Sequence, residues 1–226
     1  MSRPMWAVAG AALLAVIPGV VFAQTTVASN RASWVTDTGF VGDRAGNSNT
    51  LTGFRGGEAY RSYISFAVPV SGAAFTSAVI RVNTATVANG PNDLTVYDVS
   101  SDIATETAST LYGDLGTGVV LGAATGLNTS NATIDITLNT AGLAAVNAAR
   151  GGEISFGFVS SPISGASDGV FLASSGTTLR QLILTPTATP PTPTPVPTLS
   201  EWALLLLGLG LAGGTALHLQ RHRRAA

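Results

Sequence analysis

The chain has no cysteine and no lysine, and its two histidines, His218 and His222, lie close to the C-terminal end. Without cysteine there is no disulfide framework, and a lipoprotein signal is excluded as well. Ser-His-Asp and Cys-His catalysis and histidine-based zinc sites are excluded upstream of His218, because the residues that they use are absent there. The 11 basic residues are all arginine and form no basic patch, so we expect no nucleic-acid partner.

Carboxylates are the remaining candidates for catalysis. A glycosidase uses two of them, about 5–10 Å apart. The available carboxylates, which fall in no recognisable motif, are Asp37, Asp43, Glu58, Asp93, Asp98, Asp102, Asp114, Asp135, Glu153 and Asp168. We therefore predict a protein that is not an enzyme and that has no catalytic residues and no cofactor. One alternative is a carboxylate-dependent hydrolase, which requires two acids facing each other in a cleft.

The N-terminal residues 1–23 have the layout of a signal peptide. Arg3 supplies the positive charge, Ala7–Val21 the apolar core, and Val21 and Ala23 the small-residue cleavage site. The predicted mature chain therefore begins at Gln24.

Residues 24–185 form an expected domain of about 160 residues, enough for a core of its own. The expected strands are Ala59–Val68, Ser77–Thr86, Leu94–Val99, Val119–Ala124, Ala132–Leu138, Glu153–Ser160, Gly169–Ala173 and Thr178–Thr185. A helix capped by Asn139 or Thr140 and ended by Gly151 interrupts them. This pattern predicts an all-β fold, an antiparallel jelly-roll-like β-sandwich with one short helix.

Aromatic residues in the domain suggest a possible sugar-binding platform. Trp34, Tyr60, Tyr63 and Tyr97 could form one, but aromatics on alternating strands more often belong to the core. We favour the core for Tyr97 and for at least one of Tyr60 and Tyr63.

A glycine-rich loop contains candidate metal ligands, and two arginines fall on expected strands. Asp37, Asp43 and two asparagines, Asn47 and Asn49, supply oxygen atoms of the kind that calcium prefers. Their spacing does not match an EF-hand, so we favour an ordinary Asx-turn loop and predict no metal site. Arg61 and Arg81 are expected on a solvated face or as cross-strand partners of acids.

The C-terminal part changes composition at Pro186. Six of the 11 prolines fall within residues 186–197, which favours an extended, semi-rigid linker. Residues 202–219 carry no charge and predict a transmembrane helix at the short end of the usual range. The arginines that follow predict a cytoplasmic C-terminus: Arg221, Arg223 and Arg224.

The order of features in residues 196–224 resembles the IPTL-CTERM sorting domain of Gram-negative bacteria, whose layout is similar to that of PEP-CTERM tails. The motif residues are Val196, Pro197, Thr198, Leu199, Ser200, Glu201 and Trp202. The family usually has Ile in place of Val196 and Gly in place of Ala203. The resemblance implies recognition by an exosortase-like protease, which removes the helix and passes the protein outward.

Three segments of the middle domain also resemble β-sandwich domains of PEP-CTERM-type exported proteins and, more distantly, DNRLRE-type jelly rolls of bacterial surface proteins. These segments are Glu58–Phe66, Ser77–Val82 and Thr95–Ser100. Some distant relatives bind polysaccharide, which makes polysaccharide a candidate partner but transfers no binding residues.

We therefore expect an exported, non-enzymatic protein of the cell surface or extracellular matrix, with a structural or adhesive role. Its precursor would sit in the inner membrane with the C-terminus in the cytoplasm, and the mature protein would end at the cell surface or outside the cell. The alternative is a carbohydrate-binding module for exopolysaccharide or cell-surface glycan. Absence of glycan binding would remove this alternative.

Overall fold

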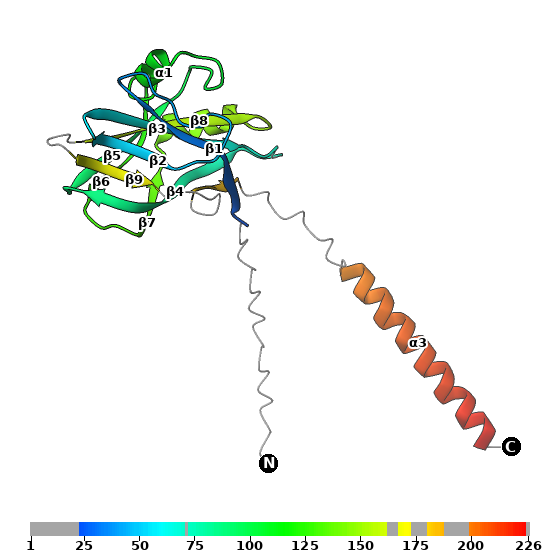
Figure 1. Ribbon diagram of the computed structural model, residues 1–226. Helices are drawn as coiled ribbons and strands as arrows, with labels where there is room; N and C mark the ends of the chain where they lie inside the picture. Colours follow the sequence, from blue (N-terminus) through cyan, green and yellow to red (C-terminus); the bar gives the residue numbers. More distant parts are fainter. Residues whose placement is uncertain (1–22, 71, 162–166, 173–179, 188–198, 225–226) are drawn as a thin grey trace. The chain divides into compact units, whose positions relative to one another are not determined.

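The computed structural model describes residues 23–70, 72–161, 167–172, 180–187 and 199–224. Contacts divide the chain into two units, Met1–Thr189 and Pro190–Ala226. Most of the predicted signal peptide, including Val21, lies outside the described residues, whereas Ala23 is described and exposed. The first unit holds all the strands, which Figure 1 shows as a layered β structure.

The first unit is an all-β sandwich in which every pairing between described strands is antiparallel. Its strands are β1 (Thr25–Thr36), β2 (Thr50–Arg55), β3 (Glu58–Ala67), β4 (Phe75–Ala88), β5 (Asn92–Asp98), β6 (Val120–Leu127), β7 (Ala132–Thr137), β8 (Glu153–Ser161), β9 (Ser167–Leu172) and β10 (Arg180–Pro186). The strands pair in the order β1-β10-β4-β9-β2-β3-β8-β5-β6, with β7 beside β4. The predicted fold class is confirmed.

Strand β1 has two partner strands, β10 and β3. Residues 25–28 pair with β10, and the rest of the strand, from Ser29 to Thr36, pairs with β3. A bulge between Ser29 and Arg31 marks the change of partner, as expected where a strand bends.

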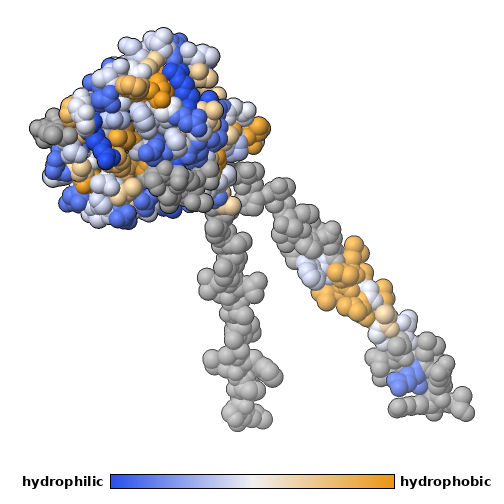
Figure 2. Space-filling model, viewed as in Figure 1, coloured by the Kyte–Doolittle hydropathy of each residue, from blue (hydrophilic) through white to orange (hydrophobic). Residues whose placement is uncertain are grey.

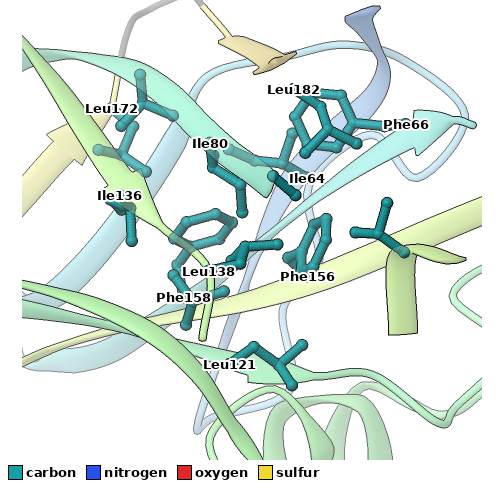
Figure 3. Close-up of a cluster of buried hydrophobic side chains, with 14 of the residues drawn as sticks. Ile64, Phe66, Ile80, Leu121, Ile136, Leu138, Phe156, Phe158, Leu172 and Leu182 are labelled. Carbon is teal, nitrogen blue, oxygen red and sulfur yellow. The ribbon is translucent and has the colours of Figure 1, made fainter. Parts of the chain in front are cut away.

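The main core lies inside the sandwich, and on β4 it follows the alternation of apolar residues along the strand. On β4, Ala78, Ile80 and Val82 are buried, whereas Arg81 between them is only half-buried. Phe66 of β3 and Phe156 of β8 meet edge to face, with ring centroids 6.1 Å apart. Figure 3 shows these rings among aliphatic side chains from several strands. This dry contact supplies the main driving force for folding.

A second, smaller core covers the outer face of β1 and β3. Helix α1 (Ala108–Asp114) packs Leu111 against Val35 and Tyr63, and Leu115 joins them. Gly157 of β8 permits this contact, because a Cβ there would lie 2.6 Å from the Leu115 carbonyl oxygen. The loop that carries α1 is thus held on the sheet by burial.

Strands β2 and β9 approach closely at a pair of glycines. Gly53 and Gly169 are register partners, with φ of +115° and +131°. A Cβ on either residue would overlap the backbone of the facing strand. Only glycine can therefore occupy these two positions.

The structure corrects the predicted number of helices. Helix α2 (Thr140–Ala148) is present with its predicted cap, because the Asn139 side chain accepts a hydrogen bond from the Gly142 N–H at 3.0 Å. Helix α1 was not predicted, so the described residues of the domain form two helices where one was expected. Strands β1 and β2 were not predicted either, because their inward residues are largely small or polar.

The second unit contains helix α3 (Leu199–Arg224), which has 26 residues. Within the part of the chain that the structure describes, no helix is both long and apolar enough to cross a membrane. The predicted transmembrane helix over residues 202–219 is therefore not supported. Its leucine run ends at Leu211, where four small or polar residues, Ala212 to Thr215, follow.

Candidate functional site

The structure separates the four aromatics considered as a sugar platform. Tyr63 is fully buried in the second core, where burial raises its pKa to about 12. Tyr97, expected in the core, is only half-buried on β5. Trp34 and Tyr60 remain together, with ring centroids 5.4 Å apart and planes inclined by 60°. Because the planes are inclined, these two rings do not form a flat stacking surface.

The acids of the glycine-rich loop cap backbone groups. Asp43 Oδ1 accepts hydrogen bonds from the Ala45 and Gly46 N–H groups at 3.1 Å each, which confirms the predicted Asx-turn. Asp37 Oδ1 accepts from the Ala59 N–H at 3.0 Å. Among the described residues, no three His, Cys, Asp or Glu side chains converge as a metal site would require.

The two arginines behave differently. Arg81 forms a bidentate pair with Asp135 on β7, with both N–O distances 2.7 Å, so it is a cross-strand partner of an acid as predicted. Hydrogen bonding to this guanidinium lowers the pKa of Asp135. Arg61 instead donates to the Tyr112 carbonyl at 2.6 Å and lies over the Tyr112 ring at 4.2 Å. It holds the last turn of α1 against β3.

A polar hollow of about 250 Å³ opens on the outer face of the sandwich, next to the loop that carries α1. It is lined by Arg31, Val99, Ser101, Asp102, Ile103, Glu153, Ile154 and Ser155. Arg31 Nη2 donates to Glu153 Oε1, and Asn30 Nδ2 donates to Glu153 Oε2. Asp102 accepts from the Ala104 N–H at 2.9 Å and from the Thr105 hydroxyl at 2.8 Å.

The hollow brings together two of the carboxylates considered for catalysis, Asp102 and Glu153. A glycosidase requires an acid whose pKa is raised. Hydrogen bonds from Ala104 and Thr105 lower the pKa of Asp102, so this group stays ionised. Glu153 is paired with Arg31. Asp102 therefore does not fit the role of that acid, and both carboxylates take part in hydrogen bonds within the hollow.

Arg180 is a further charged group that the sequence reasoning missed. It is fully buried at the start of β10, and its Nη1 donates to the Ser48 carbonyl at 2.6 Å. Burial lowers its pKa to about 10. A signal was present, since Arg180 shares its strand face with Leu182 and Leu184, both of which are buried. Its hydrogen bond to Ser48 holds the loop before β2 in place, and the side chain is buried within the protein.

The sorting motif extends into helix α3. Val196, Pro197 and Thr198 lie outside the described residues, whereas Leu199 and Ser200 begin the helix and Trp202 is exposed. The helix then presents leucines that are 58–70% exposed: Leu204, Leu205, Leu206, Leu207, Leu209 and Leu211. Figure 2 shows this run as a band of hydrophobic residues on the helix.

Leu204–Leu207 are consecutive and, together with Leu209 and Leu211, surround the helix axis, a pattern typical of a helix that is covered on all sides. Glu201 and the arginines of the basic cluster lie in the first and last turns of α3, and their side chains are outside the described part. Positively charged residues at the C-terminal end of a helix interact favourably with the helix dipole. The helix therefore offers an apolar middle between a motif at one end and a basic cluster at the other.

Comparison with known proteins identifies this end of the chain and not the sandwich. Residues 194–224 match the family model of the IPTL-CTERM motif. No curated protein matches the chain, so the expected likeness of the middle domain to DNRLRE-type sandwiches stays a prediction. The chain therefore carries an IPTL-CTERM motif, which supports an exported protein with a C-terminal sorting signal.

Proposed function

We propose that this is an exported, non-enzymatic protein that places a β-sandwich on the cell surface or in the extracellular matrix. The match of residues 194–224 to the IPTL-CTERM motif is the observation that carries the proposal. The strands of the sandwich end before this motif, at Pro186, so the sorting sequence and the folded domain occupy different parts of the chain.

The exposed leucines of α3 favour a sorting segment in an apolar environment over a helix that stays exposed to water. An apolar side chain of this size gains roughly 1.5–3 kcal/mol on burial, so six exposed leucines forgo on the order of 10 kcal/mol. Such a surface requires an apolar environment. A membrane-associated precursor supplies that environment, and removal of the segment by an exosortase-like protease would release the sandwich from it.

The test is the mature C-terminus of the protein expressed in a Gram-negative host that has an exosortase-like protease. We expect intact-mass measurement to find an extracellular chain ending near Thr198. A chain with Pro197→Ala and Glu201→Gln should remain unprocessed, and Thr192→Ala, which lies before the matched residues, should be processed normally. An extracellular chain that still contains Arg224 and ends at Ala226 would contradict the proposal.

A carbohydrate-binding role is the second candidate, and the polar hollow at Arg31 favours it. The inclined planes of Trp34 and Tyr60 do not make the flat aromatic surface on which sugar rings stack. Recognition of a glycan would therefore rest on hydrogen bonds from the hollow.

A further inference from the structure

We propose that the hollow lined by Arg31, Asp102 and Glu153 binds one neutral sugar unit of a polysaccharide through adjacent hydroxyl groups. This assignment deepens the carbohydrate-binding candidate and does not depend on the sorting motif.

The hollow exists because small residues form the sheet beneath it. Arg31 of β1, Ser65 of β3 and Ser155 of β8 are register neighbours across three strands. The Ser65 and Ser155 hydroxyls form a hydrogen bond with each other at 2.7 Å. In the next row of the sheet, Leu115 covers Gly157. The loop that carries α1 therefore covers the Gly157 row, whereas in the neighbouring row Arg31 and Ser155 line the hollow and Ser65 is buried.

Donors and acceptors around the hollow keep unused capacity. Arg31 uses Nη2 for Glu153, and its Nε and Nη1 have no partner among the described residues. Each carboxylate oxygen of Asp102 and Glu153 accepts a hydrogen bond from protein. An ionised carboxylate offers about four acceptor positions, so positions remain on both groups. A hydroxyl both donates and accepts, and adjacent hydroxyls match an arginine beside carboxylates.

The mixture of charges selects against charged ligands. An anion that approached Arg31 would also meet Asp102 and Glu153, and a cation would meet the arginine. Asp102 stays ionised because the Ala104 and Thr105 hydrogen bonds favour the charged form. A like charge inside the hollow would be repelled. A neutral polar ligand satisfies the same groups without this repulsion.

The ion pair also holds the binding groups in place before a ligand arrives. Glu153 is fixed by Arg31 and by Asn30, and Asp102 is fixed by the turn that it caps. Groups that are already ordered lose little conformational entropy on binding. The volume of about 250 Å³ lies below the range of about 300–1,000 Å³ for drug-sized ligands, which suits a single ring of an open-ended chain.

The first test is a glycan array with the purified full-length chain. The array carries neutral hexose, 6-deoxyhexose and pentose polymers next to polymers of uronic acids and amino sugars. We expect binding to one or more neutral polymers and weaker binding to their charged counterparts. Binding to no neutral polymer, or preferential binding to uronic acids or amino sugars, overturns the assignment.

Variants then locate the site with the best neutral polymer as the probe. Arg31→Lys keeps the charge but loses the planar fork, and we expect at least a tenfold loss of affinity. The matched control is Arg81→Lys, which changes another arginine–carboxylate pair outside the hollow and should leave affinity unchanged. If the Arg31→Lys chain bound with the same affinity as the wild type, the binding site would lie elsewhere and the assignment would be wrong.

A third variant separates recognition from folding. Asp102→Asn removes one negative charge from the hollow and keeps the shape of the side chain. We expect uronic acid polymers to gain at least fivefold in affinity relative to neutral ones. A purely structural effect of the substitution would change both classes equally, and that result would contradict the role assigned to Asp102. Failure of export with intact glycan binding would instead count against the sorting proposal alone.

Discussion

Arg180 provides a prediction whose sign can be worked out from its surroundings. The side chain is fully buried, and no ion pair of Arg180 occurs among the described residues. Its pKa falls from 12.5 to about 10 through burial. At 1.36 kcal/mol per pKa unit, this fall means that keeping the guanidinium charged costs the fold about 3 kcal/mol.

Hydrogen bonds offset part of that cost. The contact with the Ser48 carbonyl is 2.6 Å long and involves a charged donor, which contributes about 1.5–3 kcal/mol. The contacts with the Asn47 carbonyl at 3.4 Å and the Thr50 hydroxyl at 3.5 Å are long and weak. Arg180 Nε has no partner among the described residues. Cost and gain are therefore nearly equal.

We expect Arg180→Met, which keeps the length of the side chain and removes the charge, to change the free energy of unfolding by no more than about 1.5 kcal/mol. Arg180→Ala leaves a cavity and carbonyl groups without a hydrogen-bond donor, and should lower the free energy of unfolding by about 2–5 kcal/mol. Urea unfolding of both chains, followed by circular dichroism, gives the comparison. If Arg180→Met lost as much stability as Arg180→Ala, the guanidinium would be a net stabiliser and the reasoning would be wrong.

The pH dependence gives an independent check on Arg180. Because its pKa is lowered in the fold, Arg180 reduces the free energy of unfolding by the full amount below pH 10. This reduction disappears as the pH rises toward 12.5, since the folded protein loses the proton before the unfolded chain does. In wild type, this group therefore adds stability between those values. Arg180→Met lacks that rise, so its stability should fall more steeply than that of wild type above pH 10.

Further substitutions test three other local features. Gly53→Ala forces a Cβ into the backbone of β9 and should cost more than about 3 kcal/mol in urea unfolding, whereas Gly56→Ala, in open space at φ +65°, should cost about 1–2 kcal/mol. Asn139→Ala removes the cap of α2 and should cost about 1–2 kcal/mol, seen as faster amide exchange in its first turn. The pKa of Tyr63 is raised from 10.0 to about 12, so stability present below pH 10 is lost as the pH rises through 12; Tyr63→Phe should remove a loss of about 3 kcal/mol. A Gly53→Ala chain as stable as wild type, unchanged exchange in α2, or an unchanged alkaline profile would contradict the respective account.

Eight of the strands could be predicted, and the signal is clearest on β4, where the apolar residues Ala78, Ile80 and Val82 alternate and point inward. Strands β1 and β2 lack this signal. On β2 the inward positions include Thr50 and Thr52, whose hydroxyls donate to carbonyls of β9 at 2.7 and 2.9 Å. Their burial depends on a partner more than 100 residues away, which local sequence does not reveal.

Helix α1 and the polar hollow were missed for the same reason. α1 has 7 residues and one buried side chain, so its own sequence gives it little stability. It is held by Arg61, about fifty residues earlier in the chain. The hollow joins Arg31 to Glu153, which are 122 positions apart. Residue types at these positions were known, but the strand register that brings them together was not.

The contacts of Thr187, the last described residue before α3, predict what processing does to the sandwich. Thr187 donates through its N–H and its hydroxyl to the Ala74 carbonyl, at 2.8 and 2.7 Å, directly after β10 ends at Pro186. Cleavage near Thr198 leaves this anchor and all of β10 on the mature protein. A chain ending at Thr198 should therefore unfold at the same temperature as the full-length chain, within about 2 °C. A larger fall in Tm would mean that residues beyond Thr198 stabilise the sandwich, which a disposable sorting segment should not do.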